Sequence, residues 1–141
     1  MNILAATFPQ ADVLAALDHS VPFSAHWSVE DWQAEFSQPA ARIWCAQEGD
    51  KLIGFIVLRG VAGQWELLNI AVAASYQHQG VATKLMRYAL DAFTDAHITL
   101  EVSSANLAAQ ALYRKVGFVI FGIRKKFYKD GTDALIMGNV L

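Results

Sequence analysis

The connection that decides the fold reads WELLNIAVAASYQHQGVAT and covers residues 65–83. Residues 65–73 are almost continuously apolar, which predicts a β-strand covered on both faces of its sheet. Val81, Leu85, Ala89 and Ala92 then recur at helical spacing and predict an amphipathic helix. We therefore expect a buried strand that leads through a tight turn into a helix, with chemistry collecting at that turn.

Gly80, at the start of this helix, is the residue that points most directly to a ligand. A glycine here lets the backbone come close to a ligand, and the free N–H groups of the first helical turn then point at an anion such as a pyrophosphate. A single glycine is equally compatible with a plain strand-to-helix connection. Neither G-x-x-x-x-G-K-[ST] nor G-x-G-x-x-G occurs in the required context, which argues against nucleoside triphosphate and dinucleotide sites.

The segments after this helix add a carboxylate to the polar face of a strand. In residues 98–102, Ile98, Leu100 and Val102 share one face, so Glu101 lies on the other. Residues 106–115 predict a further helix, ended by Gly117. Residues 118–128 and 134–140 then close the chain as a β-hairpin.

The segments before residue 65 predict two helices and three strands. A strand near residues 3–6 leads into a helix at 11–18 that carries Val13, Leu14 and Leu17 on one side. Ser28, three residues before Asp31, predicts the N-cap of a second helix. Residues 43–47 and 51–59 predict a hairpin. The order β-α-α-β-β-β-α-β-α-β-β indicates an α/β fold, which we expect to form one domain over residues 1–141.

The composition argues against several classes of partner. Of the 141 residues, 55% are hydrophobic and 17% are charged, so the chain is expected to fold around its own core. The net charge is -2 and no long basic run occurs, which predicts no nucleic-acid partner. No apolar run approaches the roughly 18 residues of a membrane span, and the first residues lack a basic leader, so no membrane association is expected.

The cysteine and histidine residues argue against a disulfide and against a metal site. Cys45 is the single cysteine, and its apolar surroundings predict a buried structural thiol in a reducing cytoplasm. The four histidines show no spacing typical of a metal site, so we expect no metal; they are His19, His26, His78 and His97.

Four stretches together resemble the GNAT acetyltransferase superfamily over nearly the whole chain. They read LLNIAV at 67–72, YQHQGVA at 76–82, LEV at 100–102 with Asn106, and ALYRKVGF at 111–118. Within that superfamily the chain is similar to the RimI type, the ribosomal-protein-alanine N-acetyltransferases, and residues 124–137 share its closing pattern. The resemblance implies a mixed central sheet of about seven strands with a splayed central pair, flanked by about four helices.

The resemblance also implies acetyl-CoA as co-substrate. Its pantetheine arm would lie along Ile70, Ala71 and Val72, whose backbone amides would polarise the thioester carbonyl, and Asn106 would hydrogen-bond the arm. The pyrophosphate would rest on the helix start, mainly through backbone N–H groups. Those residues are His78, Gln79, Gly80, Val81, Ala82 and Thr83.

Two proton-handling residues follow from the same resemblance. Glu101 would be the base that takes the proton of the attacking amine, directly or through water, although a solvated or salt-bridged glutamate is the alternative. Tyr113, twelve residues later, would be the acid for the departing thiolate, and a packed aromatic residue is the alternative.

The resemblance implies the N-terminal alanine of a small-subunit ribosomal protein as acceptor. Phe23, Trp27 and residues 124–131 would flank the acceptor. Ser103, Lys126 and Phe127 depart from the residues usual in the RimI type, which leaves the acceptor open. A small-molecule amine acetyltransferase and a non-catalytic coenzyme A-binding module are the alternatives.

Overall fold

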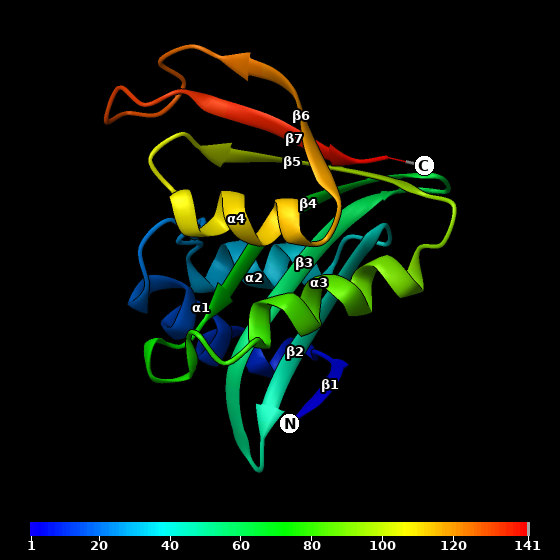
Figure 1. Cartoon of the computed structure of the whole chain (residues 1–141). Coiled ribbons are helices and arrows are strands. Elements are labelled where there is room, and N and C mark those ends of the chain that lie inside the picture. The colour runs from blue at the N-terminus through cyan, green and yellow to red at the C-terminus, as the bar shows by residue number, and fades with distance from the viewer. Residues whose placement is uncertain (141) are drawn as a thin grey trace.

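The computed structural model describes residues 1–140 as a seven-stranded sheet with helices on both faces (Figure 1). The strand order is β1-β2-β3-β4-β5-β7-β6. The strands are β1 (Asn2–Ala5), β2 (Ala41–Glu48), β3 (Lys51–Val61), β4 (Gln64–Val72), β5 (His97–Ser103), β6 (Phe118–Arg124) and β7 (Ala134–Asn139). The helices are α1 (Ala11–Ser20), α2 (Val29–Phe36), α3 (Val81–Ala92) and α4 (Leu107–Lys115), with short 3-10 turns at Phe8–Gln10 and Ala74–Tyr76.

The helices form two layers, one on each face of the sheet. α1 and α2 enclose one core with residues of β2, β3 and β4, centred on Leu14, Trp32 and Phe55. α3 and α4 enclose the other, which includes Leu85 and Tyr113 (Figure 1). The alternation predicted for β5 is confirmed, since Ile98, Leu100 and Val102 all belong to the core under α3 and α4. Glu101 consequently lies on the opposite face of the sheet.

β4 and β5 are the central parallel pair, and they separate after a short contact. Their register runs only from Gln64 opposite His97 to Glu66 opposite Thr99. β4 stays paired with β3 as far as Val72, while β5 pairs with β7 through Ser103. A β-bulge at Leu68 shifts the β3–β4 register and adds local twist. This arrangement confirms the expected α/β sheet with a splayed central pair and four flanking helices.

Three details of the sequence prediction are wrong. Val13 is 49% exposed, because the buried stripe of α1 is formed by positions 11, 14, 15, 17 and 18. Ala92 is also exposed, at the last turn of α3. The strand expected to reach residue 128 ends at Arg124, since Lys126 takes a left-handed φ of 50° and donates its N–H to the Asp133 carboxylate.

Two local predictions are confirmed, the N-cap of α2 and the burial of Cys45. Ser28 caps α2 through a capping box with Asp31, and Cys45 is buried, which raises the pKa of its thiol. Within residues 1–140, no helix has the length and apolar character needed to cross a membrane. The same residues contain no group of three or more His, Cys, Asp or Glu side chains arranged to hold a metal ion.

Candidate active site

A cleft of about 1430 Å³ lies where β4 and β5 separate. Its walls come from the loop before α2, from β4, from the start of α3, from the end of β5, from α4 and from the loop before β7. Glu101 and Asn69 belong to one side of the sheet, whereas Tyr113 belongs to the core on the other. The cleft therefore runs between the two strands and connects both faces of the sheet.

The open edge of β4 supplies one wall of this cleft. From Leu67 to Val72 this edge has no strand partner, since the pairing with β5 ends at Glu66. Ile70, Ala71 and Val72 line the cleft, as the sequence predicts. Backbone N–H groups on an open strand edge are free to bind the amide groups of an extended ligand or to polarise a carbonyl.

The N-terminus of α3 supplies a second wall and is free of side-chain caps. Gly80 is the N-cap and has a left-handed φ of 82°. Within the described part of the chain, no side chain makes a capping hydrogen bond at this end of the helix. The first intrahelical bond there runs from Lys84 N to the Gly80 carbonyl, so the N–H groups of residues 81–83 remain available. Ser28 and Asn106, in contrast, cap α2 and α4 with their side chains. The start of α3 can thus receive an anion.

The turn that leads into α3 is held by its own glutamines. Gln77 Nε2 donates to the Val72 carbonyl at 3.0 Å and ties the turn to the end of β4. Gln79 Nε2 donates to the Ser75 carbonyl at 3.3 Å, and Gln79 does not line the cleft. Gln79 is therefore the one predicted binding residue that the geometry does not bring to the site; His78, Gly80, Val81, Ala82 and Thr83 all line it.

Asn106 lines the cleft but is already engaged as a helix cap. Its Oδ1 accepts from the N–H of Ala109 at 3.1 Å. The side-chain Nδ2 group is left to donate to a ligand, because the amide carries two donors in addition to its acceptor oxygen. The predicted hydrogen bond to the pantetheine arm can therefore be made by Nδ2 and not by Oδ1.

Glu101 lies in the cleft, as expected of a catalytic base, and it also forms an ion pair, as in the alternative interpretation. Its side chain is 25% exposed and lines the cleft. The carboxylate also forms an ion pair with Arg124, whose guanidinium nitrogen lies 3.4 Å away. Arg124 in turn lies over the Phe127 ring at 5.5 Å. The carboxylate is therefore accessible to a ligand and oriented by a neighbouring cation.

Tyr113 is 4% exposed, and its environment favours the protonated phenol. Burial raises the pKa of Tyr113 well above its usual value, and the negative charge of an ionised Tyr128 would raise it further. Tyr113 lines the cleft. Among residues 1–140, no fully buried side-chain nitrogen or oxygen lacks a hydrogen-bond partner, so the Tyr113 hydroxyl is not a fully buried atom without a partner. A protonated hydroxyl at such a position can donate a hydrogen bond to a ligand.

Sequence reasoning missed Tyr128, which lines the cleft beside Glu101. Burial raises its pKa, and the negative charges of Glu101 and Asp130 add to the effect. Asp130 itself has a lowered pKa, mainly because the Thr132 side chain donates a hydrogen bond to it. The family resemblance places residues 124–131 at the acceptor side, but nothing in the sequence singles out Tyr128 over the adjacent Phe127.

The loop before α2 forms the last wall. Phe23 lines the cleft and is 57% exposed, together with its neighbours Ser24, Ala25 and His26. Trp27, expected beside Phe23, does not line it, because its ring packs against Trp32 at a centroid distance of 5.0 Å. Ser103 lines the cleft, and its hydroxyl lies 3.0 Å from that of Thr132.

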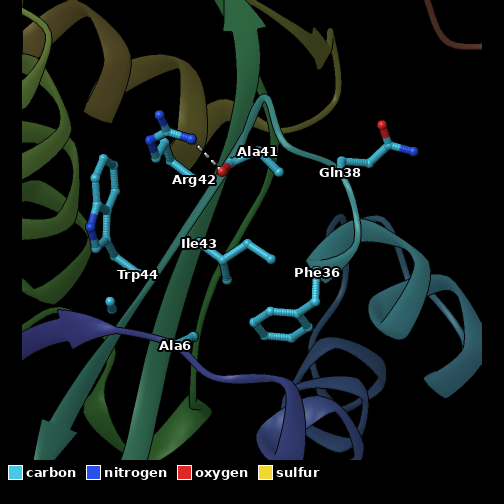
Figure 2. A pocket seen from close by; sticks show the side chains of 8 residues that line it. Ala6, Phe36, Gln38, Ala41, Arg42, Ile43 and Trp44 are labelled. Carbon is cyan, nitrogen blue, oxygen red and sulfur yellow. Dashed lines mark hydrogen bonds between the residues drawn. The ribbon is translucent and has the colours of Figure 1, made fainter.

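A smaller hollow of about 210 Å³ lies between β1, β2 and the end of α2 (Figure 2). Phe36 and Ile43 face it, and Arg42 curls back to donate to the Ala41 carbonyl at 2.9 Å. None of the predicted site residues contributes to it. The candidate active site is therefore the cleft between β4 and β5.

Substituting Gly80 by Ala tests the anion site at α3. The left-handed φ of Gly80 strains any L-residue by about 1–2 kcal/mol, and the added methyl group would project into open space at the helix start. We expect coenzyme A to bind roughly tenfold more weakly in a calorimetric titration. Gly63→Ala is the matched control, because Gly63 has a φ of 83° and equally open space in the β3–β4 turn. Equal losses in both variants would contradict the assignment.

The comparisons with known proteins agree with this geometry. The acetyltransferase (GNAT) family profile matches residues 8–118. The chain is 33% identical over 116 residues to N-alpha-acetyltransferase RimI of Mycobacterium tuberculosis, covering 79% of this chain and 73% of the relative. It is 33% identical over 117 residues to the ribosomal protein bS18-alanine N-acetyltransferase of Escherichia coli, covering 79% of this chain and 78% of the relative.

A solved structure extends the likeness to the three-dimensional fold. The crystal structure of the ribosomal-protein-S18-alanine N-acetyltransferase from Escherichia coli superposes with a TM-score of 0.88 at 26% identity. The superposition covers 98% of this chain and 92% of that one. With the profile match and the splayed β4–β5 cleft, this likeness shows that the chain belongs to the acetyltransferase (GNAT) family and is an acetyl-CoA-dependent N-acetyltransferase.

Proposed function

We propose that this acetyltransferase modifies the α-amine of an N-terminal alanine on a small-subunit ribosomal protein. Two relatives at 33% identity carry names that state N-α-acetylation or acetylation of ribosomal protein bS18 at alanine. The observation that carries the proposal is that Glu101 and Tyr113 line one cleft beside the open edge of β4. A carboxylate and a protonated phenol at one reaction centre suit amine acetylation.

The donor side of the cleft fits acetyl-CoA. Acetyl-CoA supplies the thioester carbonyl that the amine attacks. The open edge at Ile70–Val72 would bind the pantetheine arm and polarise that carbonyl, and the uncapped N–H groups of α3 would bind the pyrophosphate. Asn106 Nδ2 would donate to the arm.

Glu101 would act on the acceptor amine. An α-amine has a pKa of about 7.7–8.0, so at neutral pH much of it is protonated and only the free base attacks. Glu101 would accept that proton directly or through a water molecule, and the Arg124 guanidinium would hold the carboxylate in place. Tyr128 and the ionised Asp130, close to Glu101, would orient the amine at this end of the cleft.

Tyr113 would assist departure of the thiolate. A phenol with a pKa above its usual value is a weaker proton donor than a free tyrosine, so its contribution is a hydrogen bond that strengthens as charge develops on sulfur. The same raised pKa keeps the donor proton in place across the physiological range.

A small-molecule amine is the second candidate acceptor. Glu66 and Asp130 line the cleft in addition to Glu101, and such carboxylates favour a cationic polyamine or aminoglycoside. Lys115 and Lys129 line the cleft as well, and Arg124 pairs with Glu101, so the acidic character is largely offset. We therefore favour a peptide N-terminus, in the cytoplasm where ribosomal proteins are made, with residues 1–141 acting as one domain.

Acetyl transfer to a short peptide that begins with alanine, from a small-subunit ribosomal protein, tests the acceptor and the base together. Mass spectrometry should locate the acetyl group on the α-amine, and Glu101→Gln should lower kcat/KM by tens-fold or more, because the amide accepts no proton. Glu30→Gln, an exposed glutamate on α2, should leave the rate unchanged. Thiol release with free amines but not with the peptide would refute the proposed acceptor.

The pH profile tests the assigned state of Tyr113. Since its pKa is raised above the ordinary 10.0, the phenol should stay protonated at higher pH than a free tyrosine. Between pH 8 and about 10, the kcat of the parent should therefore not fall, or should fall only as much as the kcat of Tyr113→Phe does. Tyr113→Phe should lower kcat roughly tenfold or more with an unchanged KM for acetyl-CoA. A variant as active as the parent would exclude Tyr113 from the chemistry.

A further inference from the structure

Asp18 carries a buried carboxylate that has no role in the proposed chemistry. It lies behind the loop at 22–27, on the proposed acceptor side of the cleft. It lies on α1, is fully buried and has no cationic partner among the ion pairs of residues 1–140. Four N–H groups donate to it: His26 N at 2.9 Å, Trp27 N at 2.8 Å, Trp32 Nε1 at 3.2 Å and Asn69 Nδ2 at 2.9 Å. Such a buried ion is tolerated only when its oxygens are fully hydrogen-bonded.

Asn69 extends this network from α1 to β4. Its side chain is buried at the bulge, and while Nδ2 donates to Asp18, Oδ1 accepts from the N–H of Ala25 at 3.1 Å. Two side chains that are 51 residues apart thus hold three consecutive backbone N–H groups, those of residues 25–27.

The loop held in this way has an unfavourable backbone. Phe23 and His26 have left-handed φ values of 70° and 58°, which cost energy for residues with a side chain. Ser24 Oγ donates to the Asp18 carbonyl at 2.7 Å, and His26 Nε2 lies 2.6 Å from the Val21 carbonyl. Most of what fixes the loop therefore converges on α1 and on Asn69.

The same network touches both halves of the cleft. Residues 23–26 line the cleft on one side, and the next residues after Asn69, Ile70–Val72, line it on the other. A shift of Asn69 would change the position of the loop relative to the open edge of β4. In a reaction between two bound molecules, a misplacement of about 1 Å can cost up to 10²-fold in rate.

We propose that Asp18 and Asn69 are positioning residues that fix the loop at 22–27, whose residues 22–26 form the acceptor wall of the cleft, against the strand that binds the acetyl donor. The proposal rests on the proposed function in taking this wall as the acceptor side. Neither side chain touches the reacting atoms in this account. Their effect is to set where the acceptor amine lies relative to the thioester.

Asn69→Ala is the principal test, since it removes both hydrogen bonds and leaves the Asp18 carboxylate in place. Hydrogen exchange measured by mass spectrometry should become faster at residues 22–27 and stay unchanged at 97–103 on β5. The KM for the acceptor should rise roughly tenfold or more, with the KM for acetyl-CoA within about twofold. Asp18→Asn should act in the same direction, provided that it folds.

Glu35→Gln is the matched control for lost stability. Glu35 on α2 is also a buried carboxylate, but its hydrogen-bond and ion-pair partner is Arg59 on β3 and not the loop at 22–27. It should lower the melting temperature without changing the KM ratio. Three results would overturn the proposal. They are unchanged hydrogen exchange at 22–27 in Asn69→Ala, equal rises of its two KM values, and the same rise of the acceptor KM in Glu35→Gln.

The acceptor in these assays is whichever substrate the parent enzyme acetylates. If that is a free amine and not the alanine peptide, the proposed function fails while the exchange and KM comparisons still decide the role of Asp18 and Asn69. If the peptide is acetylated but loop exchange does not respond to Asn69→Ala, the positioning role alone fails.

Discussion

β4 and β5 run together for three residue pairs and then separate, and the cleft exists because each strand keeps a different neighbour beyond that point. β3 holds β4 as far as Val72, and β7 holds β5 as far as Ser103, so the sheet can tolerate an open central edge. The chain leaving β4 turns into α3 at Gly80, whose uncapped N–H groups face the same opening. An extended donor with an anionic middle would therefore meet an open strand edge and a helix N-terminus in succession.

The proposed acceptor side is built by tertiary contacts and not by a single element. The loop before α2 depends on Asp18 and Asn69, while the loop before β7 depends on the Asp133 and Asp130 carboxylates, which accept from Lys126 and Thr132. Both loops contain residues with left-handed backbones that isolated segments would not hold. The proposed donor side, which uses regular strand and helix geometry, is the more local of the two.

Sequence patterns predict the elements that strand and helix periodicity determine, and they do not predict how individual side chains bond or pack in the folded chain. The apolar alternation in β5 places Glu101 on the correct face, and Ser28 begins α2 as expected, because strand and helix periodicity decide both. Gln79 follows the family pattern yet bonds back to Ser75, and Trp27 packs on Trp32 instead of lining the cleft. Nothing in the sequence signals that Asp18 and Asn69 touch, or that Arg124 reaches Glu101, because those contacts require the folded sheet.

Coenzyme A is proposed to lie between β4 and the start of α3, and backbone-amide NMR during a coenzyme A titration tests that placement most directly. The largest shift changes should fall on residues 70–72 and 80–83, with smaller ones at Asn106 and little change in the hollow around Phe36 and Ile43. Changes centred on that hollow, or the absence of any change at the start of α3, would contradict the central claim.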